Sequence, residues 1–480
     1  MGASTRALYV APATALPRVA AGSQWRTTAS IVICDLVCLW CVFVFAVVWR
    51  HMTDPAYEVG FSTFQLLPCL GMMMVAFWIQ GLYPGVMLHP AEEMRRVVFS
   101  ACTVFLVIAS TAFLWRTAET YSRSVYLLTW AAAAPAVLLA RHAVRRRLGR
   151  VEWWGVPAVV LGSGTSAQRV VRSLQDGSRG VKVVAVVSAD RPGNWPEDLA
   201  PVAGHLSLCN GMGARYAIVA MPEKGSGETR HVMQDYCSGF SHVFVVPDMT
   251  GICSLGVSAR EIGSEFGIEM PQRLFHRNAA VTKRVLDLVT GGVALVLAAP
   301  VFAVVAVLIK ATSRGPVFYR DQRYGRGGEV VEALKFRTMV PNAKAVLAEY
   351  LEANPVARRE WLRDRKLRED PRVTGVGKWL RRTSLDELPQ LWNVLAGEMS
   401  LVGPRPIVEA EIEKYGRGYG LYTRVRPGIT GLWQVSGRNN TTYEERVGFD
   451  EYYVRNWSIW MDAYILVRTI KVVLTGEGAY

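Results

Sequence analysis

Four long apolar segments, all within the first 150 residues, constrain this chain more than any other feature. They cover approximately residues 30–49, 61–82, 97–115 and 124–140. A helix needs about 20 apolar residues to cross the hydrocarbon core of a bilayer, and each segment is close to that length. The sequence therefore predicts a transmembrane domain over residues 1–150, built as a four-helix bundle.

Arginine residues distinguish the two sides of these segments. The N-terminal tail, the second connection and the stretch after the fourth segment together carry ten arginines, whereas the opposite connections carry three. Because cytoplasmic flanks are enriched in Lys and Arg, the N-terminus and everything after residue 141 are expected in the cytoplasm. Asp35 lies inside the first segment, and since a carboxylate facing lipid is costly, it is expected to face other helices, in a structural or a transport role.

The overall composition agrees with a membrane protein. The formal net charge is +14, 51% of the residues are hydrophobic and only 20% are charged. Surplus positive charge in an apolar chain suits anionic head groups or phosphorylated substrates. A soluble nucleic-acid binder is not expected, because its basic excess comes without such hydrophobicity.

Residues 151–278 have a different character, with short β-rich runs separated by polar, Gly-containing stretches. The first run leads into Gly162-Ser163-Gly164-Thr165-Ser166-Ala167 and then a short helix, the order of a dinucleotide-binding fold. Asp190 lies farther from Gly162 than the roughly 20 residues expected of a ribose ligand, so a bound dinucleotide has little support. The pattern predicts a Rossmann-like α/β domain with strands at residues 156–161, 181–187, 217–220 and 242–246.

A fifth apolar run covers residues 285–309 and could cross a membrane by length alone. Basic residues flank it on both sides, beginning with Lys283 and Arg284, and a full crossing would separate the C-terminal region from the cytoplasm. Pro300 lacks an N–H group and breaks or kinks a helix near the middle of the run. We therefore expect a re-entrant membrane helix at the start of a third domain, residues 279–480.

Residues 357–372 mix arginines with Trp361 and two leucines. This composition is typical of a helix that lies on an anionic membrane surface. A merely solvated charged face is the alternative.

The C-terminal domain must work without histidine or cysteine. All seven histidines occur by residue 276 and all eight cysteines by residue 253. This disfavours a Ser-His-Asp triad, a cysteine nucleophile and a His-containing metal centre there, and leaves carboxylates, Lys, Arg and Mg²⁺ as chemical equipment. Phosphoryl transfer suits that equipment.

The densest carboxylate setting is residues 381–393, Arg-Arg-Thr-Ser-Leu-Asp-Glu-Leu-Pro-Gln-Leu-Trp-Asn. Consecutive side chains on a helix diverge by about 100°, so Asp386 and Glu387 need not do the same job. One could attack phosphorus while the other holds a cation. The alternative is an exposed acidic helix start with Ser384 as its N-cap.

Four further motifs surround this stretch and decide the interpretation. They are Lys-Phe-Arg-Thr-Met at 335–339, Asp-Pro-Arg-Val-Thr at 370–374, GEMSLVGPRP at 397–406 and RPGITGLWQVSGR at 426–438. Together, over about residues 279–480, they resemble the bacterial sugar transferase family, the monotopic phosphoglycosyl transferases. The preceding spans and the Rossmann-like insert look like the large, undecaprenyl-phosphate galactose phosphotransferase type.

This resemblance implies an α-rich monotopic catalytic domain in which Asp386 is the nucleophile and Glu387 a Mg²⁺ ligand. It also implies that Lys283 and Arg284 begin the re-entrant helix and that Pro300 breaks it. Thr338 stands where many members have Ser, and Glu398 where many have Asp; neither belongs to the carboxylate pair. In the context of the motifs, substrate phosphate is expected to contact Lys335, Arg337, Arg372, Arg381, Arg405 and Arg426.

The implied reaction takes a hexose 1-phosphate from a UDP-hexose, holds it covalently on Asp386, releases UMP and passes the sugar phosphate to polyprenyl (undecaprenyl) phosphate. The product would begin an exopolysaccharide or lipopolysaccharide O-antigen repeat unit at the bacterial inner membrane. The expected partners are these two substrates and the lipid bilayer, a homodimer is allowed, and no nucleic acid is expected. The hexose itself is left open.

Two rival functions follow from the same domains. A membrane-anchored nucleotide-sugar dehydratase or epimerase would also pair spans with a Rossmann domain, but no Tyr in this chain has Lys four residues later, the usual pair of such enzymes. A non-enzymatic polysaccharide-assembly scaffold would use the four spans and Asp35. Release of UMP by the purified protein separates the transferase from the scaffold.

Overall fold

The computed structural model describes most of the membrane and C-terminal regions and part of the middle region. The described residues are 23–54, 67–114, 122–174 without 152 and 163, 180–187, 214, 216–220, 240–246, 258–262, 265–269, 274, and 277–475 without 365–366, 368–369 and 437–440. The chain forms two compact units, Met1–Met249 and Thr250–Tyr480. The domain boundaries expected at residues 150 and 278 stay a prediction.

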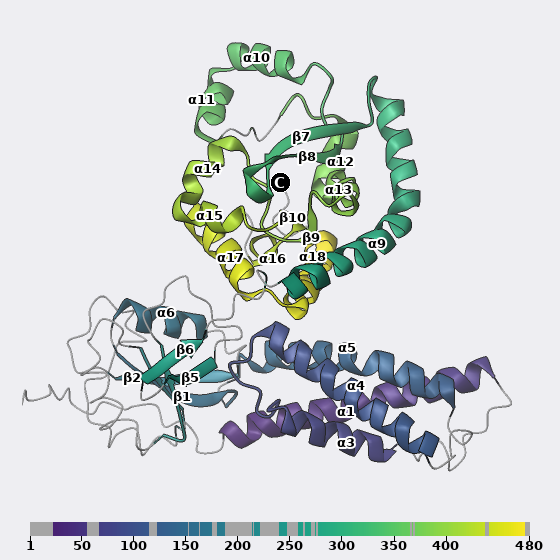
Figure 1. Ribbon diagram of the computed structural model, residues 1–480, viewed down its shortest axis with the longest axis vertical. Coiled ribbons are helices and arrows are strands. Elements are labelled where there is room, and N and C mark those ends of the chain that lie inside the picture. Colours follow the sequence, from purple (N-terminus) through teal and green to yellow (C-terminus); the bar gives the residue numbers. More distant parts are fainter. Residues whose placement is uncertain are drawn as a thin grey trace, which may run out of the picture. The chain divides into compact units, whose positions relative to one another are not determined.

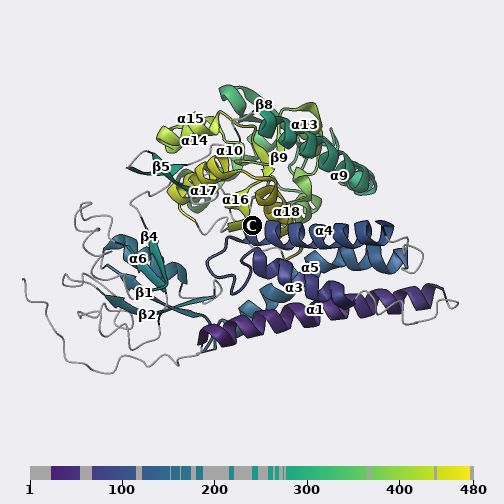
Figure 2. The same ribbon diagram turned by 60° about the horizontal axis from the view of Figure 1, so that its bottom comes forward.

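Four helices lie side by side at the start of the first unit: α1 (Ser23–Thr53), α3 (Leu67–Ile79), α4 (Pro90–Leu114) and α5 (Arg123–Leu148) (Figures 1 and 2). Among the described residues, α1, α4, α5 and the later helix α9 (Arg277–Thr312) are long and apolar enough to cross a membrane, whereas α3 is a shorter apolar helix. Residues 61–66 of the second expected span lie outside the described part.

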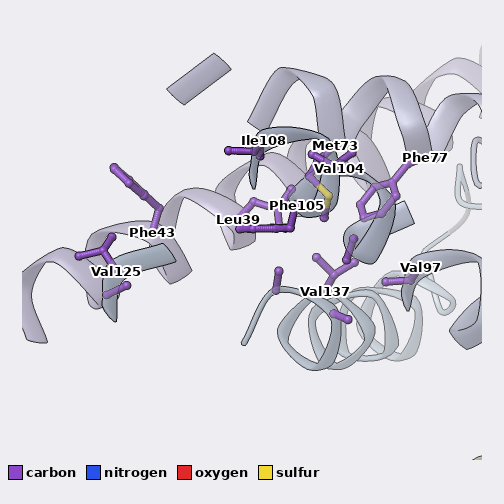
Figure 3. Packing of buried hydrophobic residues seen from close by; sticks show 14 of the residues in the cluster. Leu39, Phe43, Met73, Phe77, Val97, Val104, Phe105, Ile108, Val125 and Val137 are labelled. Atoms are coloured by element: carbon purple, nitrogen blue, oxygen red, sulfur yellow. The ribbon is translucent and has the colours of Figure 1, made fainter. Parts of the chain in front are cut away.

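The bundle buries large apolar side chains between its helices and exposes others. Leu39, Phe77, Phe105 and Val137 come from four different helices and belong to one buried cluster (Figure 3). Leu139, by contrast, keeps 70% of its surface exposed. Apolar side chains on both the inside and the outside of a bundle are the pattern of helices surrounded by lipid.

A buried ionic network connects three of these helices. Asp35 on α1 and Arg141 on α5 are 0% and 1% exposed, and their side chains form an ion pair at 2.5 Å. Arg141 also donates to Glu93 on α4 at 3.0 Å, and Arg145 pairs with Glu93 at 2.6 Å. The hydroxyl of Tyr83 donates to Asp35 at 2.7 Å. The prediction that Asp35 faces other helices is confirmed.

The middle region is an α/β domain with a parallel sheet of strand order β2-β1-β3-β4. The first strand is buried along its whole length, as a parallel strand covered on both faces should be. The predicted strands are confirmed to within one residue, whereas Ser163 and Asp190 lie outside the described residues. The elements are β1 (Val156–Leu161), α6 (Thr165–Leu174), β2 (Val181–Val187), β3 (Tyr216–Val219) and β4 (His242–Val245).

The second unit contains the long apolar helix α9 (Arg277–Thr312). The helix starts six residues before Lys283, so Lys283 and Arg284 lie in its second turn rather than at its beginning. Pro300 lies inside a continuous helix, which is bent in Figure 1. The expectation that Pro300 breaks the helix is therefore wrong. A proline removes one backbone hydrogen bond, and the bonds of the neighbouring residues keep the helix continuous.

Both ends of α9 are held by the second unit itself. Near its start, Arg284 donates to the carbonyl oxygens of Val394 at 2.6 Å and Leu395 at 2.9 Å. Near its end, Val305 and Ile309 are buried in one cluster with Phe336 and Leu380, whose members include residues of β8 and α12.

A buried polar cluster adds to the first of these attachments. Lys283 pairs with Asp287 at 3.2 Å and with Asp462 on α18 at 2.9 Å. Ser400 and the backbone N–H of Leu401 donate to Asp287 at 2.7 and 3.1 Å. Because these buried groups satisfy one another, the beginning of α9 is fixed to the body of this unit.

The rest of the second unit is α-rich, as expected, with short two-stranded sheets. The helix α11 ends at Asp364, so the single helix expected over 357–372 is wrong at its C-terminal end, and Arg372 lies in a later turn. The elements are β5 (Ser258–Ile262), β6 (Glu265–Glu269), β7 (Phe318–Tyr324), η4 (Arg326–Gly328), β8 (Val330–Phe336), α10 (Ala343–Ala353), α11 (Pro355–Asp364), α12 (Gly375–Thr383), η5 (Leu385–Glu387), α13 (Gln390–Ala396), β9 (Ser400–Val402), α14 (Glu409–Tyr415), η6 (Gly416–Gly418), α15 (Tyr419–Tyr422), β10 (Gly428–Thr430), α16 (Leu432–Ser436), α17 (Tyr443–Asn456) and α18 (Ile459–Thr475).

Candidate active site

The β7–β8 hairpin provides one wall of the candidate site. Its antiparallel register places Asp321 opposite Ala333 and Arg323 opposite Val331. Side chains alternate between the two faces of a strand, so Asp321 and Arg323 share a face with Ala333 and Lys335. The small side chain of Ala333 leaves space between the charged ones.

The carboxylate pair lies where α12 ends and the short helix η5 begins. Ser384 has a left-handed backbone conformation, with φ of 56°. It terminates α12, and its backbone N–H donates to the carbonyl oxygen of Arg381. Its side chain makes no capping hydrogen bond to η5, which disfavours the alternative of an acidic helix start capped by Ser384. The left-handed residue instead turns the chain, so that Asp386 and Glu387 follow directly on η5.

A close backbone contact fixes α12 against the end of the hairpin. A Cβ atom on Gly377 would collide with the backbone oxygen of Thr338, so only glycine permits this approach. Farther along α12, Arg381 donates from Nε to the hydroxyl of Thr338 at 3.0 Å. Thr338 therefore supplies the hydroxyl that accepts this bond.

Glu387 and three cationic side chains line a small hollow at the surface of the second unit. The Nζ atom of Lys335 is 3.3 Å from Oε1 of Glu387, and Nη2 of Arg405 is 3.7 Å from the same oxygen. Asp386 has no ion pair with any residue that the structure describes. The lining residues are Arg323, Ala333, Lys335, Glu387, Gln390, Arg405, Pro406, Gly428 and Ile429.

The two adjacent carboxylates have opposite pKa shifts. Burial and the charge of Glu387 raise the pKa of Asp386 to about 6, against the opposing effects of Lys335 and Arg381. Burial also acts to raise the pKa of Glu387, but Arg405, Lys335 and Arg323 outweigh it and lower that pKa below its usual value. Environments that separate two neighbouring carboxyl groups in this way are typical of carboxylates with different chemical roles.

Lys335 and Arg405, both expected to contact phosphate, line the hollow. The positive charge of Arg381 acts to lower the pKa of Asp386. Three other arginines with the same expected role make local contacts elsewhere. Their role in phosphate binding stays a prediction, and their observed bonds stabilise the surrounding backbone. Arg337 donates to the carbonyl and hydroxyl of Ser313, Arg372 forms a two-pronged pair with Asp370 and lies over the Trp361 ring, and Arg426 donates to the carbonyl of Gly397.

Sequence reasoning missed three side chains at or beside the hollow: Asp321, Arg323 and Gln390. A signal existed for the first two, since the alternation of Arg-Asp-Gln-Arg in a strand places Asp321 and Arg323 on one face. Gln390 lies only three residues beyond Glu387 and carries no charge to attract notice.

The donor set is compatible with Mg²⁺ only when a substrate shares the ion. Among the described residues, no group of three or more His, Cys, Asp or Glu side chains could hold a metal. Mg²⁺ typically takes one or two carboxylates and completes its shell with water and phosphate oxygens. The adjacent carboxyl groups of Asp386 and Glu387 fit that limited requirement.

Asp386 has no ion pair among the described residues, and its neighbour Glu387 lines a hollow with three cations. Such a site is suited to phosphate transfer, and it lies in a unit that carries a long apolar helix. This defines a membrane-associated transferase. The chain belongs to the bacterial sugar transferase family.

Comparisons with known proteins carry this assignment. The family described as Bacterial sugar transferase matches residues 278–476. The undecaprenyl-phosphate galactose phosphotransferase of Salmonella typhimurium is 36% identical over 458 residues, covering 92% of this chain and 93% of that protein. The UDP-galactose-lipid carrier transferase of Erwinia amylovora is 38% identical over 367 residues, covering 75% of this chain and 76% of that protein.

Two other similarities concern parts of the chain. The exopolysaccharide production protein ExoY of Rhizobium meliloti is 46% identical over 223 residues, which are 99% of that protein but 46% of this chain. A family described as CoA-binding domain matches residues 79–208, which include α4, α5 and the first two strands of the parallel sheet.

Proposed function

We propose that this protein transfers a hexose 1-phosphate from a UDP-hexose to undecaprenyl phosphate and releases UMP. The observation that carries the proposal is Asp386, a partly buried carboxylate without an ion pair to any described residue. Its neighbour Glu387 lines the hollow together with Arg323, Lys335 and Arg405. The names of the two long relatives, one acting on undecaprenyl phosphate and one named for UDP-galactose, support the substrate classes.

The first step is attack by a carboxylate oxygen of Asp386 on the sugar-linked phosphorus of the UDP-hexose. A new bond forms between that oxygen and phosphorus while the bond from phosphorus to the bridging oxygen breaks. UMP leaves with the electron pair of the broken bond, and the sugar phosphate stays on Asp386. Lys335 and Arg405 bind the negative oxygens of the diphosphate and stabilise the charge that develops on them.

The second step returns the enzyme to its starting state. An oxygen of undecaprenyl phosphate attacks the same phosphorus, the bond to Asp386 breaks, and the carboxylate is regenerated. The product is undecaprenyl diphosphate hexose, which would begin an exopolysaccharide or O-antigen repeat unit. Dividing the transfer into two steps lets a soluble and a lipid substrate use one nucleophile in turn.

Glu387 is the proposed protein ligand of Mg²⁺, which would neutralise part of the phosphate charge when bound. The lowered pKa of Glu387 keeps its carboxylate ionised at neutral pH. Lys335 and Arg405 hold its Oε1 atom at distances of 3.3 and 3.7 Å, longer than close ion pairs, so its oxygens are not fully committed to them.

The attachment of α9 supports re-entry into the membrane rather than a crossing. Its beginning is fixed through Lys283, Arg284 and Asp287, and its end through Val305 and Ile309, to one and the same compact unit. Because both ends of α9 are attached to one compact unit, they must lie on the same side of a bilayer. The apolar surface of α9 would then enter one leaflet.

Orientation in the bacterial inner membrane follows from the arginine distribution, with the middle and catalytic domains in the cytoplasm. Single cysteine labels near Arg150 and near Arg314 should both be protected from a reagent that cannot cross the membrane. Labelling at Arg314 from the periplasm would overturn the re-entrant topology.

The middle domain is proposed to be Rossmann-like, on the strength of its parallel strand order and the turn after β1, where Gly162 has φ of 129°. The chemistry does not require it, since every residue assigned a chemical role lies in the second unit. The length of ExoY, which matches only 46% of this chain, agrees with such a division.

Incubating the purified protein with undecaprenyl phosphate and a panel of UDP-sugars tests the proposed function. UMP should appear with UDP-galactose or UDP-glucose and should depend on Mg²⁺. Omitting the lipid should leave one phosphohexose on the protein, located at Asp386 by mass spectrometry. A phosphohexose on another residue would contradict the assignment of the nucleophile, and absence of UMP with every UDP-sugar would contradict the reaction.

A further inference from the structure

Asp321 lies outside all the motifs that carry the family resemblance, yet it contacts two of the cations of the hollow. Its Oδ2 atom accepts from Nη2 of Arg323 at 2.6 Å and from Nε at 3.0 Å. The same oxygen is 3.5 Å from Nζ of Lys335. All three side chains are about one-fifth exposed, so solvent screens these contacts only in part.

The hairpin explains why these groups meet. Asp321 and Arg323 are two residues apart on β7, and Lys335 is the diagonal neighbour of Asp321 on β8, two residues beyond its direct partner Ala333. Residues in these positions project from the same face of a two-stranded sheet. The hairpin thus places one carboxylate between two cationic side chains.

Lys335 is shared between two carboxylates. Its Nζ atom is 3.5 Å from Asp321 and 3.3 Å from Glu387, so neither carboxylate has it alone. Lysine has a long and flexible side chain, and its position depends on the charges around it. Without Asp321, Lys335 would be free to form a closer pair with Glu387 and to neutralise it.

Arg323 is oriented by the same carboxylate. Its bonds to Asp321 use Nε and Nη2, one edge of the planar guanidinium. No described residue accepts a hydrogen bond from Nη1, so these donors are available to a ligand in the hollow, which Arg323 lines. A guanidinium held in this way loses less conformational entropy when it binds phosphate.

We propose that Asp321 is a positioning residue for the substrate diphosphate: it orients Arg323, which binds the diphosphate directly, and keeps Lys335 from closing onto Glu387. This inference rests on the proposed function, because it requires a diphosphate in the hollow. Arg323, Lys335 and Arg405 line the hollow, and Glu387 is the one carboxylate among its lining residues. A lining with three cationic side chains suits an anionic diphosphate.

The same hairpin offers a matched control on its other face. Glu332 on β8 pairs with Arg320 on β7 at 2.8 Å, with side chains 48% and 70% exposed. Neither residue lines the hollow. The change Glu332→Gln therefore removes a carboxylate and an ion pair from the hairpin without touching the proposed site.

The experiment measures kcat and KM for UMP release with UDP-galactose or UDP-glucose, whichever the wild-type protein uses. Asp321→Asn should raise KM for the UDP-sugar about tenfold, the effect of losing one charged phosphate contact, with a smaller fall in kcat. Asp321→Glu should recover most of this loss. Glu332→Gln should leave both constants within about twofold of the wild type, as expected for an exposed pair.

The double variant decides whether Asp321 acts through Arg323. Arg323→Gln should raise KM by about as much as Asp321→Asn, and the two changes together should cost little more than either alone. Additive effects, or an unchanged KM in Asp321→Asn, would overturn the inference. If Asp321→Asn does not fold, the KM of Arg323→Gln decides: a wild-type KM overturns the inference.

These outcomes separate the inference from the proposed function. A wild-type protein that releases UMP, with an Asp321→Asn variant that is just as good, refutes the positioning role alone. A wild-type protein that releases no UMP from any UDP-sugar refutes the proposed function and this inference with it.

Discussion

The chain contains two clusters of acidic and basic side chains that are arranged in opposite ways. In the membrane bundle, Asp35 and Glu93 are both paired with arginines, at distances of 2.5 to 3.0 Å, and the two acids balance Arg141 and Arg145. In the catalytic unit, the cations lie 3.3 and 3.7 Å from Glu387, and Asp386 has no ion pair among the described residues.

This difference separates a structural cluster from a reactive one. A buried charge that is fully paired and hydrogen-bonded has its interactions satisfied within the protein, and removing one partner is strongly destabilising. A carboxylate held among cations without close pairing remains able to react or to bind a ligand, at some expense in stability. Variants of Asp386, Arg141 and Lys335 test this contrast.

The largest expected effect belongs to Asp386. The change Asp386→Asn should lower UMP release at least about a thousandfold, because an amide cannot supply the attacking oxygen. Glu387→Gln should lower the rate less and weaken its dependence on Mg²⁺. Wild-type turnover in Asp386→Asn, measured alongside the control Glu332→Gln, would show that the unpaired carboxylate is not the nucleophile.

The structural cluster should respond in stability. Arg141→Met leaves Asp35 uncompensated and should cost about 3–5 kcal/mol of unfolding free energy, seen as a lower thermal midpoint in detergent. Replacing Asp35 by Leu in the same variant should recover much of this loss, since the buried charge is then gone and Glu93 still has Arg145. If the double variant is less stable than Arg141→Met alone, an uncompensated charge on Asp35 is not the cause of the lost stability.

The pH dependence of turnover should report the environment of Asp386. Its pKa of about 6 lies above the usual value, so the reactive, ionised form is present above pH 6 and is lost as the pH falls through that value. Below about pH 6, kcat/KM should fall about tenfold per pH unit. Lys335 lowers this pKa, so Lys335→Gln should move the acid limb to higher pH. An acid limb near pH 4 would mean that Asp386 is an ordinary exposed carboxylate.

The smallest expected effect concerns the bend in α9. Pro300→Ala restores a backbone N–H and removes the ring, so α9 should become straighter and turnover should fall severalfold. The depth of spin labels along α9 in vesicles measures the first change, and UMP release measures the second. Unchanged depth and activity would show that the bend does not depend on the proline.

Much of the fold could be predicted because it depends on local patterns. Apolar length predicted the long helices α1, α4 and α5, and β-rich runs predicted the strands of the parallel sheet to within one residue. The boundary at Asp364 could not be read in this way, because charged and apolar residues continue beyond it in the same proportions. Nor could the course of α9 through Pro300, because neighbouring packing decides whether a proline bends a helix or ends it.

The candidate site shows the same difference between local patterns and tertiary packing. The sequence by itself determined the chemical equipment: adjacent carboxylates, many arginines, and neither histidine nor cysteine after residue 276. Tertiary structure decided which charges meet. It paired Asp35 with Arg141 across 106 residues, directed Arg337 and Arg426 to backbone carbonyls, and brought Asp321 beside Lys335. The physical reason is that periodicity and motifs are local, whereas the pairing of charges depends on distances that exist only once distant strands and helices have packed together.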